Sequence, residues 1–153
     1  VDLQDELTQN LSPEQRRRIN QYDSSIAYTD GILSNVVCEV RKANRPAFVL
    51  YFSDHGETPA SSAFRDQADR DLWEIPFFVW FSPEYAMAYP ETVRRLRAVE
   101  GAPLQLDQMT LGILELFQIA GSEGSGSFLQ SGFQFRRQRM ILRGKKAYDP
   151  LMK

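Results

Sequence analysis

Apolar residues recur at helical spacing over the first quarter of the chain. The segment Ser12-Pro13-Glu14-Gln15 has the features of a helix start, because Ser can cap free N–H groups, Pro fits the first turn and Gln can bond back to the cap. The apolar positions then follow in steps of three, four and seven: Ile19, Tyr22, Ile26, Leu33, Val36, Val37 and Val40. The pattern predicts a helix with one inward stripe, in which Gly31 marks either a close packing point or a break between two helices.

Two short apolar runs have the length of β-strands. Residues 47–53 and 75–81 are rich in β-branched and aromatic side chains, as is typical of strands that are covered on both faces. The polar stretch 57–71 between them has no strong period and is expected to be a loop over an open edge. The first run is therefore predicted to be a central parallel strand.

The second half of the chain contains further helix signals. Helices are predicted from Ser82-Pro83-Glu84 onward, over 90–99 and over 106–119, the last with Asp107 as a candidate cap. Residues 121–127 are rich in Gly and Ser and are expected to be a flexible connector, and residues 139–142 are a candidate edge strand. Helices that alternate with buried strands predict an α/β fold with a mixed, mostly parallel sheet and flanking helices.

Composition adds exclusions rather than a function. The 153 residues, 42% of them hydrophobic, can support one compact core. A formal net charge of -2 gives no broad attraction to nucleic acid, so no nucleic-acid partner is expected. No apolar run reaches the roughly 18 residues that cross a bilayer, so the chain as given is expected to be soluble. It begins at Val1 without a methionine, which suggests an excised piece of something longer, and its single cysteine, Cys38, is expected to be buried among valines.

Candidate chemistry follows the first apolar run. Ser53-Asp54-His55-Gly56-Glu57 stands where the chain leaves a predicted strand, and ligands collect beyond the carboxyl ends of strands in open α/β sheets. A carboxylate and an imidazole side by side can direct oxygen and nitrogen at one divalent metal, for which zinc fits best, and Gly56 would permit a sharp exit. The alternative for Asp-His-Gly alone is a hydrogen-bonded loop turn.

Longer segments place that motif in a family context. Through residues 22–30 (Tyr-Asp-Ser-Ser-Ile-Ala-Tyr-Thr-Asp) and 49–57, the chain closely resembles the phosphoethanolamine transferases of the alkaline phosphatase and sulfatase superfamily. Residues 75–80 and 146–149 continue the resemblance, which runs from about Asn20 to Asp149. It implies an alkaline-phosphatase-like fold, of which residues 1–153 are the C-terminal part only.

The resemblance also implies a reaction. Asp54 and His55 would be zinc ligands, while a further acidic ligand and a threonine nucleophile would lie upstream, so no catalytic nucleophile is expected in this chain. The implied enzyme moves phosphoethanolamine from phosphatidylethanolamine to a lipid A, sugar or glycan acceptor through a phosphothreonine intermediate. The parent would include an N-terminal half and a membrane anchor, with its catalytic domain on the periplasmic side of the bacterial inner membrane, where it would modify lipopolysaccharide.

The chain departs from the family pattern in its histidines. Family members usually carry two more after the Asp-His pair, at places that fall near Gln67 and Glu74, whereas His55 is the only histidine here. We expect Gly56, Glu57, Gln67 and Glu74 to support the ligands or to contact substrate. Two alternatives stay open: a sulfatase or phosphodiesterase-type hydrolase of the same superfamily, and a non-catalytic lobe. The acceptor, the identity of the metal and a homodimer that covers an exposed sheet edge also stay open.

Overall fold

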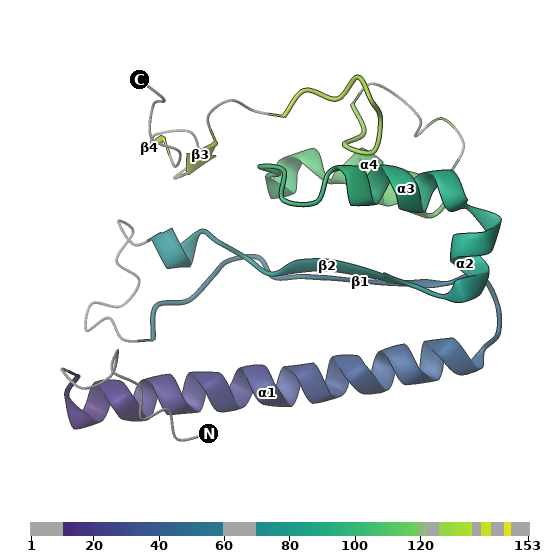
Figure 1. Ribbon diagram of the computed structural model, residues 1–153. Helices are drawn as coiled ribbons and strands as arrows, with labels where there is room; N and C mark the ends of the chain where they lie inside the picture. Colours follow the sequence, from purple (N-terminus) through teal and green to yellow (C-terminus); the bar gives the residue numbers. More distant parts are fainter. Residues whose placement is uncertain are drawn as a thin grey trace. The chain divides into compact units, whose positions relative to one another are not determined.

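A computed structural model describes residues 11–59, 70–119, 121, 126–135, 139–141 and 146–147. The chain divides into two compact units, Val1–Ser82 and Pro83–Lys153. The first unit contains helix α1 (Pro13–Lys42), strand β1 (Phe48–Phe52), the 3₁₀ helix η2 (Arg70–Leu72) and strand β2 (Phe77–Phe81) (Figure 1). The predicted long helix and both predicted strands are therefore present.

Helix α1 begins at a complete capping box. The Ser12 hydroxyl accepts a hydrogen bond from the Gln15 amide at 3.2 Å, and the Ser12 amide donates to the Gln15 side chain at 2.9 Å. Pro13 occupies the first turn, where its missing N–H is not needed. The helix then continues for 30 residues through Gly31, so the break considered for that glycine does not occur.

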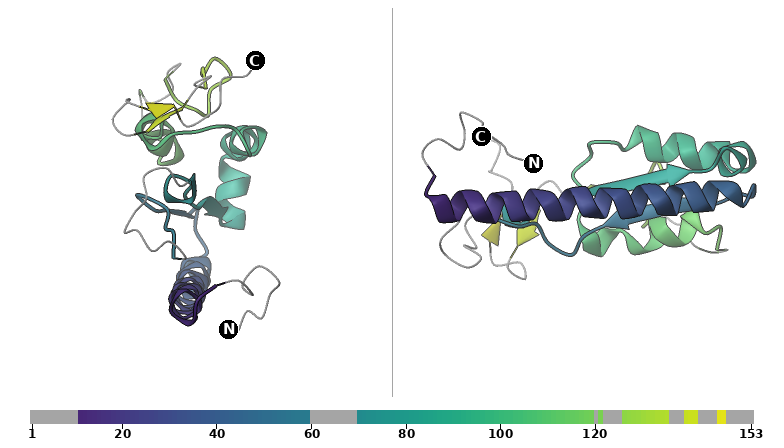
Figure 2. Two further views of the ribbon diagram at one scale, coloured as in Figure 1. Left: turned by 90° about the vertical axis from the view of Figure 1, so that its left-hand side faces the viewer. Right: turned by 90° about the horizontal axis from the view of Figure 1, so that it is seen from below.

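The strands β1 and β2 lie beside α1, which runs along them in Figure 1 and in the right-hand view of Figure 2. The Arg41 guanidinium of α1 lies 5.7 Å from the centre of the Trp80 ring on β2, so the sheet face that carries Trp80 turns toward the helix. Even so, no residue of α1 is fully buried. The expectation of a buried Cys38 is wrong: Cys38 is exposed, because each residue turns about 100° around a helix and this position points away from the stripe.

The pairing of β1 with β2 is antiparallel, from Phe48 opposite Phe81 to Phe52 opposite Phe77. Ring contacts tie the strands together, with 6.5 Å between the centres of Phe48 and Phe81 and 5.5 Å between those of Tyr51 and Phe78. The expected central parallel strand is therefore wrong for this pair, and the described strands do not support a mostly parallel sheet. A continuous apolar run carries no information about the direction of the neighbouring strand, and here it does not mean that both faces are covered, because Phe52 and Phe78 are exposed.

The second unit is mainly helical. It contains α2 (Pro83–Ala88), α3 (Pro90–Ala98), the 3₁₀ helix η3 (Leu106–Gln108), α4 (Thr110–Leu116) and a short antiparallel pair, β3 (Met140–Ile141) with β4 (Lys146–Ala147). The helix predicted over 106–119 is thus shorter and is preceded by η3. Asp107 is not a cap, because it lies inside η3, whose N-cap is Gln105, and the N-cap of α4 is Met109.

The core of the second unit forms where residues 127–129 pack against α4. Phe128, Leu129 and Leu116 are almost completely buried, and the Phe128 ring occupies the space where Gly112 lacks a side chain. Ser127, the last residue of the predicted connector 121–127, is fully buried too. Residues 122–125 of that connector lie outside the described part of the chain.

Candidate metal-binding site

The segment Ser53–Glu57 directly follows the carboxyl end of β1. Within it, the Ser53 hydroxyl donates to the His55 carbonyl oxygen at 2.9 Å. The Gly56 amide donates to the carbonyl oxygen of Leu72 at 2.8 Å and so ties the loop to the segment that begins with η2. The sequence-predicted site therefore sits on a loop that is hydrogen-bonded on itself and to a second segment.

Gly56 is required by close packing of two backbones. A Cβ added at this position would lie 1.8 Å from the Asp71 carbonyl oxygen and 2.5 Å from that of Glu74. Both atoms belong to the main chain, which cannot swing aside as a flexible side chain can. The glycine predicted to permit a sharp exit thus permits the 70–74 segment to approach the loop.

His55 and Asp54 lie side by side at the tip of this loop. The imidazole Nδ1 is 2.6 Å from the Gly56 carbonyl oxygen, and Nε2 is 3.9 Å from Oδ1 of Asp54. With the proton on Nδ1 donated to that carbonyl, the lone pair that can bind a metal is on Nε2, which faces Asp54. The His55 side chain is 36% exposed and that of Asp54 is 90% exposed, so the carboxylate can rotate toward a shared ion.

The two side chains are of a chemical type that binds divalent metals. Zinc takes imidazole nitrogen and carboxylate oxygen, and neighbouring donors in a tetrahedral site lie about 3.3 Å apart when the bonds are near 2.0 Å. The 3.9 Å between Nε2 and Oδ1 is longer than that spacing, so a shared ion would require the exposed Asp54 side chain to move closer to His55. In the part of the chain that the structure describes, no group of three or more His, Cys, Asp and Glu is arranged so that it could hold a metal.

Three further residues were predicted to support the ligands or to contact substrate: Glu57, Gln67 and Glu74. Glu57 is exposed, and its carboxylate accepts a hydrogen bond from the Thr58 amide at 3.0 Å. Glu74 is exposed, and its carbonyl oxygen lies under Gly56. Gln67 lies outside the described residues.

Two residues near the loop were not found from the sequence. Leu72 is buried, and its carbonyl oxygen accepts from Gly56; its signal was one apolar residue at the end of a polar stretch. Thr58 is also buried, and its hydroxyl has no hydrogen-bond partner among the residues that the structure describes. The stretch 57–71, which was expected to be a loop over an open edge, therefore contains the buried Thr58 near its start and is followed by the buried Leu72.

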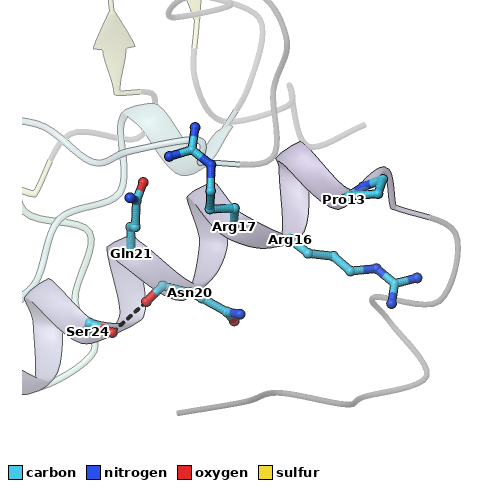
Figure 3. Close-up of a pocket in the computed structure, with 6 residues that line it drawn as sticks. All are labelled: Pro13, Arg16, Arg17, Asn20, Gln21 and Ser24. Carbon is cyan, nitrogen blue, oxygen red and sulfur yellow. Dashed lines mark hydrogen bonds between the residues drawn. The ribbon is translucent and has the colours of Figure 1, made fainter.

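A hollow on the first turns of α1 is a separate feature. It is open, has a volume of ≈ 590 Å³ and is lined by Pro13, Arg16, Arg17, Asn20, Gln21 and Ser24 (Figure 3). Figure 3 shows Arg17 and Gln21 projecting from one side of the helix and Arg16 from another. Because the two guanidinium groups diverge, they do not converge on one anion, and we do not count the hollow as a site.

The resolved pKa shifts lie in the second unit. Hydrogen bonds from Arg94 and Arg95 lower the pKa of the exposed Glu91 to about 2, and the same pairing raises the pKa of Arg94. Burial raises the pKa of Tyr85, whose hydroxyl donates to the Leu116 carbonyl oxygen at 2.5 Å. These groups stabilise α2, α3 and α4 rather than a reaction centre.

Residues 3–119 match the sulfatase family, and the chain therefore belongs to that family within the alkaline phosphatase and sulfatase superfamily. Its relatives include phosphoethanolamine transferases. The chain is 30% identical over 93 residues to phosphoethanolamine transferase EptC of Escherichia coli K12, which covers 56% of this chain and 16% of that protein. It is 37% identical over 68 residues to EptA of Helicobacter pylori, covering 40% of the chain and 13% of EptA.

A third relative is the Kdo(2)-lipid A phosphoethanolamine 7''-transferase of E. coli K12, with 35% identity over 72 residues, 44% of this chain and 12% of that enzyme. The match to these three proteins thus spans 12% to 16% of their lengths. No solved structure matches the chain at a significant level. The family confirms the resemblance seen in the sequence and supports an α/β class of fold.

Proposed function

We propose that this chain is part of a transferase that moves phosphoethanolamine from phosphatidylethanolamine to a lipid A, sugar or glycan acceptor, with Asp54 and His55 as ligands of a zinc ion. The observation that carries the proposal is the hydrogen bond from His55 Nδ1 to the Gly56 carbonyl oxygen, which turns Nε2 toward Asp54. The names of the relatives supply the group that is transferred.

The residues of this chain would hold and orient the metal. The hydrogen bond from the Gly56 amide to the Leu72 carbonyl oxygen holds the loop against the 70–74 segment. The hydrogen bond from His55 Nδ1 to the Gly56 carbonyl oxygen orients the imidazole ring. When bound, a zinc ion would draw charge from the reacting phosphate oxygens and lower the pKa of an attacking hydroxyl. The nucleophile, a threonine that would form a covalent phosphothreonine, would come from an upstream part of the polypeptide, which would also supply the remaining ligands.

The acceptor and location follow from the same proposal. One relative is named for transfer to Kdo(2)-lipid A, which favours lipid A as the acceptor here. We place the parent polypeptide at the inner membrane with its catalytic domain facing the periplasm. Among the described residues, no helix combines the length and the apolarity that crossing a bilayer requires.

A hydrolase is the second candidate, because the family that matches residues 3–119 is described as sulfatase. The two candidates differ in the upstream nucleophile: a threonine favours transfer, and a cysteine or serine in a sulfatase signature favours sulfate ester cleavage. A non-catalytic lobe is distinguished from both by a lack of metal.

The test compares metal content and transfer activity of the full polypeptide that carries this chain with those of its His55→Ala and Asp54→Asn variants. Metal is counted by mass spectrometry, and transfer is followed from a fluorescent phosphatidylethanolamine. We expect zinc in the parent, loss of that zinc in His55→Ala, and a fall in transfer of at least about 100-fold.

Glu100→Gln is the matched control, since Glu100 is exposed in the turn after α3 and far along the chain from the loop. It should keep both metal and activity. Zinc that is retained in His55→Ala and Asp54→Asn would refute the ligand assignment. A parent that binds zinc but only hydrolyses sulfate esters would support the hydrolase instead.

A further inference from the structure

The peptide unit between His55 and Gly56 is hydrogen-bonded on both of its sides. Its carbonyl oxygen accepts from the Ser53 hydroxyl at 2.9 Å, and its N–H donates to the Leu72 carbonyl oxygen at 2.8 Å. Both distances are those of well-formed hydrogen bonds. A planar peptide that is held at its oxygen and at its hydrogen has little freedom to rotate. Ser53 and Leu72 together therefore fix the orientation of this one peptide plane.

Gly56 makes such a restraint necessary. Close packing against the main chain of Asp71 and Glu74 leaves no room for a Cβ, so this position takes a glycine. Glycine also has less restricted backbone dihedral angles than any other residue. The residue directly after His55 would thus loosen the loop if its peptide were not held on both sides.

The restraint reaches the imidazole ring through the next carbonyl group. The Gly56 carbonyl oxygen lies 2.6 Å from His55 Nδ1, so its direction sets the rotation of the ring and turns Nε2 toward Asp54. A rotation of the 55–56 peptide would move Gly56 and its carbonyl oxygen, and the ring would follow. Ser53 thus acts on the His55 side chain through the backbone.

We propose that Ser53 is a positioning residue for His55, because its hydroxyl holds the 55–56 peptide in the orientation that presents Nε2 to a metal ion. The inference rests on the proposed function in one respect, that zinc is the ion that His55 binds. Ser53 is half-buried, so its hydroxyl is partly shielded from water that would compete for the His55 carbonyl oxygen. A serine bonded to the main chain two residues on is also an ordinary way to form a turn, and the tests separate the two roles.

Zinc affinity of the full polypeptide is compared with that of Ser53→Ala and Ser53→Thr. Zinc is titrated against a competing chelator, and the midpoint of denaturant unfolding is recorded for each variant. We expect zinc to bind about 10–100-fold more weakly to Ser53→Ala, because groups that orient a ligand contribute that much to metal affinity. Ser53→Thr keeps a hydroxyl on Cβ and should bind zinc as the parent does.

Thr58→Val is the matched control. It removes a buried hydroxyl from the same loop and keeps the branched shape of the side chain. The Thr58 hydroxyl has no hydrogen-bond partner among the described residues, so its loss breaks no bond that holds the loop. Zinc affinity should therefore stay at that of the parent.

Hydrogen exchange of the Gly56 amide gives a readout that needs no metal. In the zinc-free polypeptide, this amide should exchange about tenfold faster in Ser53→Ala than in the parent, because loss of the bond at the oxygen frees the N–H of the same peptide. Ser53→Thr should restore slow exchange.

Three results of the zinc titration would overturn the proposal: parent affinity in Ser53→Ala, the same weakening in Ser53→Thr, or an equal loss in Thr58→Val. Unchanged exchange at Gly56 in Ser53→Ala would overturn it as well. A parent polypeptide that binds no zinc would refute the proposed function, and the exchange rates would still decide whether Ser53 holds the 55–56 peptide.

Discussion

At the scale of single residues, the Asp54-His55 pair depends on close packing of its loop against the main chain of residues 70–74. Side-chain chemistry alone does not reveal this contact. His55 is oriented by Gly56 through the carbonyl oxygen, and Gly56 is held by Leu72 through its amide. The 70–74 segment comes so close that only a residue without a Cβ fits. One glycine therefore takes part in two contacts that fix the loop.

Replacement of Gly56 by alanine should destabilise the protein. The added methyl group meets two carbonyl oxygens, so the loop or the 70–74 segment must move, at a cost of about 1–3 kcal/mol in the free energy of unfolding. Denaturant unfolding of the full polypeptide measures this, and metal content should fall as well.

Gly31→Ala is the control. Gly31 lies in the middle of α1 with no atom near an added Cβ, so alanine should raise stability by about 0.5–1 kcal/mol. Similar changes in the free energy of unfolding for Gly56→Ala and Gly31→Ala would refute the close contact between Gly56 and residues 70–74.

At the scale of elements, local signals predicted the helices and tertiary contacts decided the rest. The Ser12–Gln15 capping box and the apolar steps were sufficient for α1, and the two apolar runs for β1 and β2. The sequence could not reveal that β1 and β2 are antiparallel, because register and direction come from partners distant in the chain. For the same reason the sequence predicted Asp54 and His55 as a pair, since they are neighbours in the chain. It did not reveal Leu72, whose contact with Gly56 forms only when the chain folds.

Ser12→Ala should weaken the start of α1. Its hydroxyl satisfies the Gln15 amide, and loss of such a cap costs about 1 kcal/mol. Hydrogen exchange of the amides in the first turn should become faster, and the unfolding midpoint should fall.

Ser34→Ala, in the exposed interior of the same helix, should leave the midpoint unchanged or raise it slightly, by at most about 0.5 kcal/mol. Unaltered exchange in the first turn of Ser12→Ala would show that the cap is not needed there.

At the scale of the whole molecule, the second unit is held together by a buried carboxylate. Glu115 is only 5% exposed and accepts hydrogen bonds from Ser127 at 2.6 Å, from Gln130 at 2.5 Å and from Arg95 at 3.4 Å. These partners stand 20 residues before it and up to 15 after it. A single network thus links α3, α4 and residues 127–130.

Glu115→Ala should cost about 1–3 kcal/mol in the free energy of unfolding, because it leaves the buried Ser127 hydroxyl without its acceptor and removes the acceptor of the Gln130 amide. Arg95 keeps its ion pair with Glu91 at 3.0 Å. Chemical denaturation of the full polypeptide measures the loss. Glu100→Ala, at an exposed position, should change stability by no more than about 0.5 kcal/mol. A loss at Glu115 as small as the loss at Glu100 would contradict the network.

The stacking of Arg41 on Trp80 gives the first unit an optical readout of its own. The indole is the fluorophore of β2, and the cation above it comes from the last turn of α1, so its emission depends on whether helix and strand remain in contact. Trp73 is the second emitter of the chain and belongs to the segment that approaches the Asp54-His55 loop. When each tryptophan is replaced in turn, the intrinsic fluorescence of the other can be measured alone. The emission wavelength and intensity of Trp80 then report the contact between α1 and β2, and those of Trp73 report the segment beside the Asp54-His55 loop, without any attached dye.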